Sequence, residues 1–416
     1  MSKRIVIIGG GIAGLSSAYY LYKSGHQVTV IDKSDITAGA SFVNAGYITP
    51  SHIIPLASPG MIVKGIKWMF NSASPFYMKP RWDPDFFRWS WYFHKSSTQA
   101  KVTKAIPVIK DINILSRGLF EDIHASGDLG EFQLERKGLL MLYKTDKAGE
   151  GELEVAQKAR FLGLEVKALD LGELKKLEPN VKLDVKGAIH YECDRHTTPT
   201  EFMPKMVKHL KDAGVNLKTN EEVLEISTSA GPITAITTSK ASYNVDEVVL
   251  AAGSWSGRIS KQLAVNLPLQ AGKGYSINVK KPTGISIPAV LMEAKAAVTP
   301  MQGFTRFAGT MEFSGINDTI RKERVEAIAK AAKSYYPEIE ISMEDKANAK
   351  SGLRPVSPDG LPYIGRSIAY SNLVYATGHA MMGWSLGPAT GKLISEIIDN
   401  KKTAMDIAPF NPDRKF

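Results

Sequence analysis

The sequence predicts an α/β protein in which a Rossmann-like dinucleotide-binding domain is interrupted by a second domain built on a largely antiparallel sheet. A glycine-rich loop joins a short apolar strand to a helix within residues 4–32. Short strands of the same kind return at 215–253, and a strand-rich segment follows at 265–345. The 416 residues exceed one typical core, which favours two domains of roughly 150–250 residues each.

The N-terminal loop contains the strongest motif. The apolar run at 4–8 fits a buried strand, and apolar residues at helical spacing follow at 13–25. Between them, Gly9, Gly11 and Gly14 form a G-x-G-x-x-G motif. The first glycine allows a tight turn, the second lets the backbone approach a pyrophosphate, and the third lets the helix pack close to the sheet. The helix N-terminus would then direct unpaired N–H groups at the phosphate.

A second predicted strand ends in an acidic residue at the spacing expected of such a motif. This residue is Asp32, eighteen residues after Gly14. Its carboxylate can accept hydrogen bonds from a ribose and would repel a 2′-phosphate. Ile12, Ala13 and Lys33 are further candidate contacts. The motif predicts a bound dinucleotide but does not by itself distinguish FAD from NAD.

The loop after this strand, 33–52, is polar and rich in small residues. Ser41, Asn44, Ala45 and Gly46 offer backbone N–H groups where bulk would exclude a ligand. An ordinary surface loop is the alternative, although loops beside a nucleotide fold often contribute to function.

Composition excludes several classes of function. The formal net charge of +10 suits a solvated basic surface, anionic lipid headgroups or an anionic substrate. No basic run is interleaved with aromatic residues in the manner that tracks a nucleic-acid backbone, so no nucleic-acid partner is expected. The single cysteine, Cys193, allows no internal disulfide, excludes Cys-x-x-Cys metal sites and favours a reducing compartment such as the cytoplasm. No metal is expected, and no apolar run approaches the ~20 residues that span a bilayer.

Residues 60–95 combine aromatic and basic side chains. The aromatic residues are Trp68, Phe70, Phe76, Tyr77, Trp82, Phe86, Phe87, Trp89, Trp91, Tyr92 and Phe93. The basic residues among them are Lys64, Lys67, Lys79, Arg81 and Arg88. One interpretation is a hydrophobic core or the wall of a substrate pocket. The other is a patch at a membrane surface, because tryptophan and basic residues together favour the membrane–water boundary.

The middle of the chain alternates predicted helices and strands. Helices are predicted at 101–126 and 150–162, with a short capped helix at 170–180. Strands are predicted at 138–145, 164–170 and 185–192. Thr198 and Pro199 suit the N-cap and first turn of another helix.

The nucleotide-binding fold is predicted to resume at residue 215. Strands are expected at 215–220, 221–229, 232–240 and 242–253. The last of these ends in Ala251, Ala252 and Gly253, whose small side chains would let the backbone lie against a ligand. Val223 is a further candidate nucleotide contact.

The rest of the chain suggests a substrate platform followed by a return to the first domain. Strands at 275–281, 289–294, 296–301 and 304–313 precede a helix at 321–336, and a strand and an amphipathic helix end the chain. We expect residues 1–74, 194–260 and 344–416 to form the nucleotide-binding domain. Residues 75–193 and 261–343 are expected to form the substrate domain.

Four segments resemble one family when they are read together. They are SFVNAGYITP, GKGYSINV, GLRPVSPDGLPYIG and TGHAMMGWSLGPATG. With the N-terminal motif, they make the chain similar, nearly from end to end, to the FAD-dependent D-amino-acid dehydrogenases. That group belongs to the wider superfamily of D-amino-acid oxidase, glycine oxidase and sarcosine oxidase.

The resemblance implies roles for individual residues. Gly9, Gly11, Gly14 and Asp32 would bind the ADP half of a non-covalent FAD, and the 41–46 loop, Ala252 and Gly253 would approach the cofactor. Arg354 of G-L-R-P would bind the substrate carboxylate. The segment that approaches the flavin would contain Gly378, His379, Met382, Gly383, Trp384 and Ser385. Tyr275 matches a pocket tyrosine, and Trp384 would also shape the pocket.

Some of these residues have plainer interpretations. Arg354 could form a salt bridge between domains, and His379 could be a hydrogen-bonding scaffold for its loop. His52, His190 and His196 suit structural roles, and Cys193 suits a buried apolar position.

The resemblance implies a reaction and leaves alternatives open. A D-amino acid or cyclic imino acid would lose a hydride to flavin N5, and the electrons would pass to a quinone or another acceptor. Met381 and Met382 replace an arginine of glycine oxidase, which favours the dehydrogenase branch. Arg195 and His196 differ from the common dehydrogenase pattern, so a hydroxy-D-proline dehydrogenase remains an alternative. An oxygen-using glycine or D-amino-acid oxidase and a non-catalytic flavin-binding module are the others. The expected location is the cytoplasm, with peripheral attachment to the inner face of the cell membrane as an option.

Overall fold

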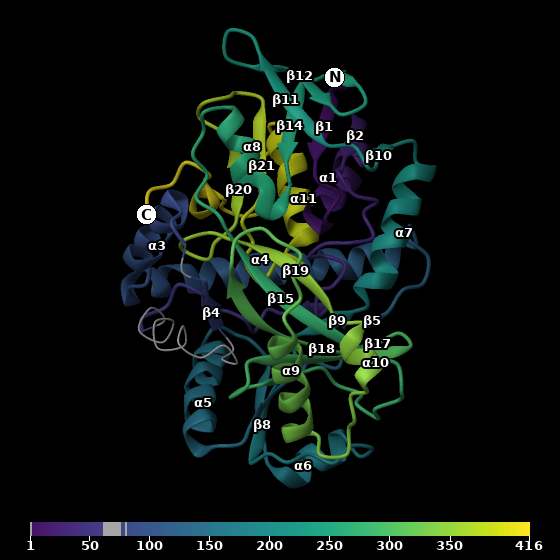
Figure 1. The fold of residues 1–416 in the computed structure, drawn as a ribbon, viewed down its shortest axis with the longest axis vertical. Helices are drawn as coiled ribbons and strands as arrows, with labels where there is room; N and C mark the ends of the chain where they lie inside the picture. The colour runs from purple at the N-terminus through teal and green to yellow at the C-terminus, as the bar shows by residue number, and fades with distance from the viewer. Residues whose placement is uncertain (1, 61–75, 80) are drawn as a thin grey trace.

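The computed structural model describes residues 2–60, 76–79 and 81–416. Of the aromatic and basic segment, Lys64, Lys67, Trp68 and Phe70 lie outside the described residues, as does the predicted domain boundary at 74/75. A six-stranded, mostly parallel sheet occupies the upper half of the molecule in Figure 1, and a larger, mostly antiparallel sheet the lower half. The predicted α/β architecture is therefore confirmed.

The six-stranded sheet is assembled from distant parts of the chain. In spatial order its strands are β10 (Asn216–Lys218), β2 (Gln27–Ile31), β1 (Arg4–Ile8), β14 (Glu247–Leu250), β21 (Leu373–Thr377) and β20 (Tyr363–Arg366). All neighbours are parallel except β20 and β21. The strands are buried on both faces and are correspondingly rich in Val and Ile.

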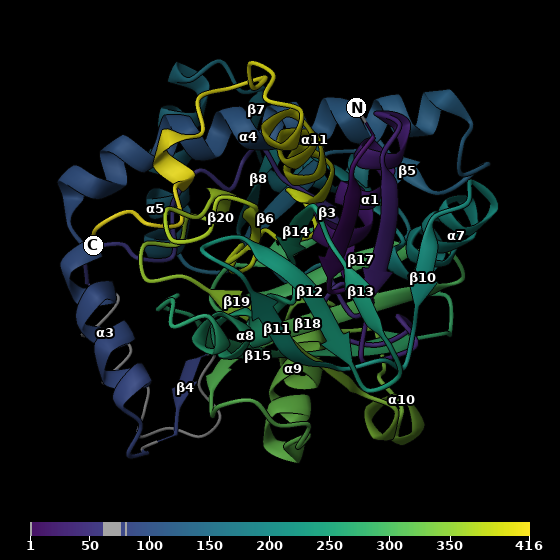
Figure 2. The ribbon, with the colours of Figure 1, turned by 90° about the horizontal axis from the view of Figure 1, so that it is seen from above.

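Helices cover one face of this sheet. They are α1 (Ile12–Lys23), α11 (Gly387–Ile398), α7 (Pro199–Asp212) and α4 (Gln99–Ser126). Their apolar residues form one buried cluster with the sheet. Helix α4 packs on α11, as Figure 2 shows, although the sequence analysis assigned residues 75–193 to the substrate domain. The face of α4 that contains Ile109, Ile112 and Phe120 completes the core of the nucleotide-binding half.

The other face is covered by a small antiparallel sheet, β11 (Val223–Thr228), β12 (Ile233–Thr238) and β13 (Ser242–Asn244). The segment 242–253, predicted as one strand, is thus two strands in two sheets. Val245 and Asp246 separate them, because Val245 N–H bonds to Thr234 of β12 and Asp246 N–H bonds to Arg4 of β1.

The second large sheet has nine strands. In order they are β19 (Lys350–Val356), β15 (Gln270–Val279), β18 (Phe304–Phe313), β17 (Ala296–Met301), β16 (Ala289–Leu291), β6 (Leu139–Tyr143), β8 (Gly187–Tyr191) and β7 (Val166–Leu169). The ninth, β4 (Phe76–Met78), pairs with β18. Only the β6–β16 and β4–β18 pairs are parallel, as expected for the largely antiparallel domain.

Strand β19 belongs to this second sheet, because it pairs with β15 from Gln270 to Ser276. From the sequence, residues 344–416 are expected in the nucleotide-binding domain. The position matters because β19 contains Arg354. The domain limits as a whole remain a prediction.

The remaining elements cover the second sheet and its edges. Helix α9 (Lys322–Tyr335) packs on one face, and α5 (Asp146–Phe161) packs on the other over β6, β7 and β8. A small sheet of β3 (Tyr47–Ile48), β9 (Arg195–Thr197) and β5 (Leu134–Glu135) links the halves. Short helices α6 (Leu171–Leu177), α8 (Ser256–Gln262) and α10 (Met343–Ala347), with 3₁₀ turns at Gly253–Trp255 and Ala408–Phe410, complete the described fold.

Candidate active site

The glycine motif lies where β1 turns into α1, and its three glycines have different neighbours. A Cβ at Gly9, whose φ is +111°, would lie 2.4 Å from the Ala251 carbonyl oxygen. A Cβ at Gly14 would lie 1.9 Å from the Gly9 carbonyl oxygen. One at Gly11 would meet only Ser41 Oγ, at 3.2 Å. The first and third glycines therefore allow the turn and the helix to pack, while the second leaves its surface open to a ligand.

The N-terminus of α1 is suited to an anion. Its N-cap is Gly11, which has no side-chain cap, and the first turn contains no acidic residue. Ser41 Oγ accepts a hydrogen bond from Ile12 N–H at 3.0 Å, so the 41–46 loop is tied to this helix end. Backbone N–H groups and the positive end of the helix dipole suit a pyrophosphate.

Asp32 has a second function, which its sequence spacing does not indicate. Its Oδ2 accepts a hydrogen bond from Gly10 N–H at 2.7 Å, and its Oδ1 accepts from Ser34 N–H and Oγ. The carboxylate therefore holds the glycine loop in shape. Two carboxylate oxygens offer about four acceptor sites, which leaves capacity for a ribose hydroxyl.

A single cavity of about 1540 Å³ extends from this loop to the nine-stranded sheet. It exceeds the 300–1,000 Å³ or so of a typical small-molecule pocket, as a dinucleotide together with a substrate requires. The predicted site residues that line it are Gly9, Gly11, Ile12, Ala13, Asp32, Lys33, Ser41, Asn44, Ala45, Val223, Ala252, Gly253, Tyr275, Arg354, His379, Met382, Gly383, Trp384 and Ser385.

Three predicted cofactor contacts are not among the lining residues. Gly14 lies inside the loop, as described. A Cβ at Gly46 would lie 2.1 Å from the Thr197 carbonyl oxygen, and one at Gly378 would lie 2.6 Å from the Tyr363 ring. Both have positive φ, at +76° and +79°. Their surroundings require glycine for chain packing, so a direct cofactor contact is not the reason for glycine there.

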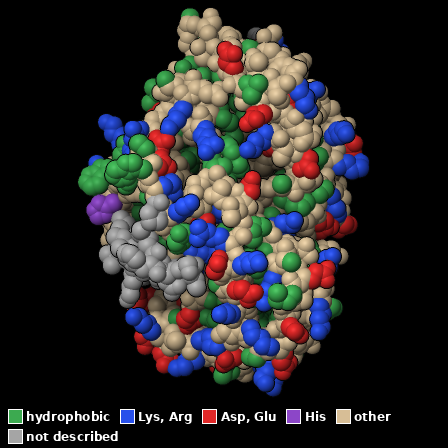
Figure 3. Space-filling view, viewed as in Figure 1, with side chains coloured by type: hydrophobic (Ala, Val, Ile, Leu, Met, Phe, Trp, Pro, Cys, Tyr) green, Lys and Arg blue, Asp and Glu red, His purple; other side chains and the backbone are tan. Residues whose placement is uncertain are grey.

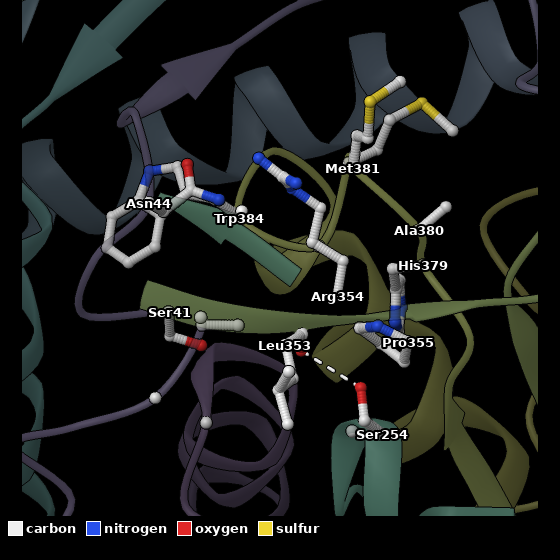
Figure 4. Close-up of a pocket in the computed structure, with 18 of the residues that line it drawn as sticks. Ser41, Asn44, Ser254, Leu353, Arg354, Pro355, His379, Ala380, Met381 and Trp384 are labelled. Carbon is white, nitrogen blue, oxygen red and sulfur yellow. Dashed lines mark hydrogen bonds between the residues drawn. The ribbon is translucent and has the colours of Figure 1, made fainter. Parts of the chain in front are cut away.

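Arg354 extends from β19 into the cavity, with Asn44 and Trp384 on one side and Met381 on the other (Figure 4). A Cβ at Gly274 would lie 2.3 Å from both terminal nitrogens, so this glycine provides the space that the guanidinium fills. Nη1 donates to the Thr310 carbonyl oxygen at 2.9 Å, and no described carboxylate pairs with the group. Burial lowers the pKa of Arg354 to about 10, so it remains charged at neutral pH. The interdomain salt bridge considered from sequence is absent among described residues.

Thr310 is a site residue that sequence reasoning missed. It lies at the β18 irregularity opposite β15, where the pairing shifts between Lys273 and Tyr275. Its φ of +62° is strained for a β-branched residue, and its buried Oγ1 has no partner among the described residues. The strained backbone turns the Thr310 carbonyl to Arg354. A bulge depends on pairing with a distant strand, so no local sequence pattern predicts it.

The Tyr275 side chain does not face Arg354. Alternate residues of a strand face opposite sides, and Gly274 faces the Arg354 guanidinium. The Tyr275 side chain therefore lies on the other face of the sheet, in the cluster against α9, where its hydroxyl donates to Glu312 at 2.7 Å. It is 2% exposed although it borders the cavity. Tyr275 thus borders the cavity, as predicted for a pocket tyrosine, but its hydroxyl is bonded to Glu312 on the opposite face of the sheet from Arg354.

Trp384 and His379 are largely buried behind the cavity surface. Trp384 is 1% exposed, packs against Phe202 and donates from Nε1 to Thr197 Oγ1 at 2.8 Å. His379 Nε2 bonds to Thr390 Oγ1 at 2.8 Å. Because the Thr390 hydroxyl donates its proton to Leu386, His379 Nε2 must be the donor in this pair. His379 therefore holds the start of α11 to its loop.

We expect His379 to make stability depend on pH. Burial lowers its pKa to about 4, below the value of about 6.5 in an unfolded chain. As the pH falls below about 6.5, the unfolded chain binds a proton that the folded chain does not, so stability is lost toward pH 4. The loss is about 2 kcal/mol between pH 7 and 5. The melting temperature of the His379→Gln variant should therefore fall less between pH 7 and 5 than that of the wild type. Parallel pH profiles for the two proteins would contradict the lowered pKa of His379.

Arg306 positions the 41–46 loop and was also missed. It is 2% exposed, and Nη1 donates to the carbonyl oxygens of Asn44 at 2.6 Å and Phe42 at 3.1 Å. Its Nε donates to Asn278 at 2.9 Å. The loop is thus fixed to the β15 and β18 strands from below and to α1 through Ser41.

The site geometry fits FAD, and comparison with known proteins agrees. A family model described as FAD dependent oxidoreductase matches residues 4–397. The chain is 30% identical to a D-amino acid dehydrogenase of Bradyrhizobium diazoefficiens, covering 99% of this chain and 98% of that protein. It is also 30% identical to a D-amino acid dehydrogenase of Helicobacter pylori, covering 99% of each.

Solved structures show the same fold. Glycine oxidase from Geobacillus kaustophilus has a TM-score of 0.79 at 21% identity, covering 100% of both chains. L-proline dehydrogenase from P. horikoshii has a TM-score of 0.75 at 20% identity, covering 99% of this chain and 97% of that one. The family model spans nearly the whole chain, and the chain therefore belongs to the family of FAD-dependent oxidoreductases.

Proposed function

We propose that the protein oxidises D-amino acids or cyclic imino acids and that Arg354 binds the substrate carboxylate. One observation carries the proposal: a charged guanidinium lies in the cavity with no described carboxylate to neutralise it. A planar guanidinium can bind both oxygens of a carboxylate through parallel hydrogen bonds. The relatives named D-amino acid dehydrogenase support this substrate class.

The proposed role of the chain is to orient the substrate. A flavin held in this cavity would supply the redox chemistry, as the acceptor of the hydride that leaves the substrate. Arg354, fixed by Thr310, would hold the carboxylate so that the Cα–H points at the cofactor. The small side chains of Ala308 and Ala297 leave room on the sheet beside Arg354. The amine need only be neutral when the hydride leaves, so we assign no acid–base residue. Water then hydrolyses an acyclic imine product.

An anaerobic screen tests this function. D- and L-amino acids, glycine, sarcosine and proline derivatives are mixed with the flavin-loaded protein, and bleaching of the flavin absorbance is followed. Fast bleaching is expected with D-amino or cyclic imino acids. If none of these compounds bleaches the flavin, the proposed substrate class is wrong.

We expect the FAD to be non-covalent. No described residue that lines the cavity is a cysteine, because Cys193 is buried in another cluster with Leu139 and Ile53. His379 is hydrogen-bonded to Thr390. Acid precipitation should release the yellow colour into the supernatant; colour that stays with the pellet would contradict this expectation.

We further propose that helix α3 (Pro84–Ser96) and Trp82 before it bind a membrane surface, where a quinone would accept the electrons. The aromatic residues here divide between two environments. Trp89 is buried and its Nε1 donates to Val356, whereas Trp82, Phe87 and Trp91 are 94%, 49% and 57% exposed. In Figure 3 hydrophobic side chains gather beside basic ones on this edge. None of the described helices has the length and apolarity to cross a bilayer.

We expect the protein to co-sediment with anionic liposomes and to be released by high salt. Exposed Arg88 and Lys95 accompany the aromatic residues, and each basic group near such a surface contributes about 1 kcal/mol. A Trp82→Ser, Trp91→Ser double variant should lose liposome binding and still be bleached by substrate. Phe161→Ser is the matched control, because Phe161 is 91% exposed elsewhere on the surface. Rapid reoxidation by air, with no response to liposomes or quinones, would favour the oxidase alternative.

A further inference from the structure

The cavity continues past Arg354 along the nine-stranded sheet. One row of directly paired residues, Ala308, Ala297, Val290 and Met141, crosses β18, β17, β16 and β6, and every member lines the cavity. Three strand spacings make this row about 14 Å long. The residues are small at the end near Arg354 and larger and apolar at the far end. We call the far end, formed by Val290, Met141 and Val155, the side wing.

A buried carboxylate lies at the side wing. Glu152 is on the face of α5 that packs on the sheet, where the other buried residues are Gly149, Ala156 and Ala159. It is 7% exposed and lines the cavity. An apolar residue would be expected at such a position, because an acidic side chain is rarely buried unless it is paired.

Only one of the two carboxylate oxygens of Glu152 has a hydrogen-bond partner among the described residues. Its Oε1 accepts a hydrogen bond from the Tyr191 hydroxyl at 2.9 Å, and Tyr191 itself is fully buried. Its Oε2 has no hydrogen-bond partner among the described residues. Burial raises the pKa of Glu152, while the Tyr191 hydrogen bond and the charge of Lys295 lower it. A ligand that offers hydrogen-bond donors and positive charge would complete this environment.

We propose that the side wing binds the substrate side chain and that Glu152 selects D-amino acids with a long side chain ending in a cation, such as lysine or arginine. This inference rests on the proposed function, because it takes the substrate carboxylate to be bound at Arg354. The cavity then has a cationic group at one end, an anionic group at the other and an apolar floor between them. A basic amino acid has the complementary order of charges: a carboxylate, an apolar stem and a cation. A short side chain, as in alanine, would leave the wing unfilled.

Lys295 allows a test of whether charge in the side wing governs the binding of a cation. It lines the cavity, is exposed, and lies in the turn between β16 and β17. Its positive charge should oppose a cationic ligand. Lys295→Gln should therefore strengthen the binding of a cation in the wing, whereas Glu152→Gln should weaken it.

The experiment uses a probe that cannot be oxidised. 5-Guanidinopentanoate has the carboxylate, the stem and the guanidinium of arginine but no α-amine, and pentanoate is its counterpart without the cation. Their dissociation constants are measured on the FAD-loaded protein from the change in flavin absorbance and by calorimetry. The wild type should bind the guanidino acid about ten- to hundredfold more tightly than pentanoate. Glu152→Gln should abolish most of that preference, and Glu154→Gln, an exposed change two residues away, should not.

The outcomes separate this inference from the proposed function. Equal binding of the two probes by the wild type, or a preference that survives Glu152→Gln, would overturn the side wing as a cation subsite. Flavin bleaching by D-arginine should fall in Glu152→Gln while bleaching by D-leucine is kept; an equal fall in both would make Glu152 structural only.

If D-amino acids fail to bleach the wild type, the proposed function fails, whatever the probe preference. Should Glu152→Gln fail to fold, an unchanged or weakened probe preference in Lys295→Gln would also contradict the inference.

Discussion

Replacing Arg354 by lysine is expected to weaken substrate binding about ten- to hundredfold, even though the positive charge is kept. An ammonium group cannot form the two parallel hydrogen bonds of a guanidinium. Its single nitrogen would also have to serve both the Thr310 carbonyl and the carboxylate, for which the guanidinium has separate nitrogens. Loss of one charge-assisted hydrogen bond corresponds to about 1.5–3 kcal/mol.

The measurement is the substrate dependence of anaerobic flavin bleaching, with flavin content determined for each variant. Arg258→Lys is the matched control, because Arg258 also lines the cavity but lies on α8, which packs against the six-stranded sheet. The control should bind substrate as the wild type does. Unchanged substrate affinity in Arg354→Lys with full flavin content would remove Arg354 from the substrate site.

The parts of the fold that follow from local sequence were predicted well. The β1 strand, the glycine turn and the α1 helix occupy consecutive residues, so their pattern is visible without knowledge of the fold. Asp32 was found because it ends the next strand at a fixed spacing. Arg354 was singled out through the resemblance, and it lines the cavity; its role in binding substrate stays a prediction.

The parts that depend on distant pairing were not predicted. Strand β19 joins the second sheet through β15, some 80 residues earlier, and no local pattern indicates the partner. The face presented by Tyr275 and the conformation of Thr310 both follow from the irregular pairing of β15 with β18. In the sequence, Glu152 cannot be distinguished from the other polar residues of an amphipathic helix. Its burial follows only from the packing of α5 on the sheet.

Gly14→Ala is expected to prevent flavin retention by destabilising the loop itself. The added methyl would lie 1.9 Å from the Gly9 carbonyl oxygen, so α1 must move away from β1. Such overpacking costs about 1–3 kcal/mol, and the movement separates the helix N-terminus from the phosphate site. Gly151→Ala is the matched control, because its Cβ would meet nothing within 4 Å and it lies on the exposed side of α5.

Gly11→Ala should separate binding from folding. Its Cβ would meet only Ser41 Oγ at 3.2 Å, so the flavin-free protein should keep its stability to within about 0.5 kcal/mol. The methyl would nevertheless occupy the surface where the backbone approaches the pyrophosphate, and FAD affinity should fall. Melting of the flavin-free proteins and titration with FAD measure the two effects. Similar flavin affinity in Gly11→Ala and the wild type would show that the pyrophosphate does not lie against this glycine. An unchanged melting temperature in Gly14→Ala would contradict the close packing of α1 against the glycine turn.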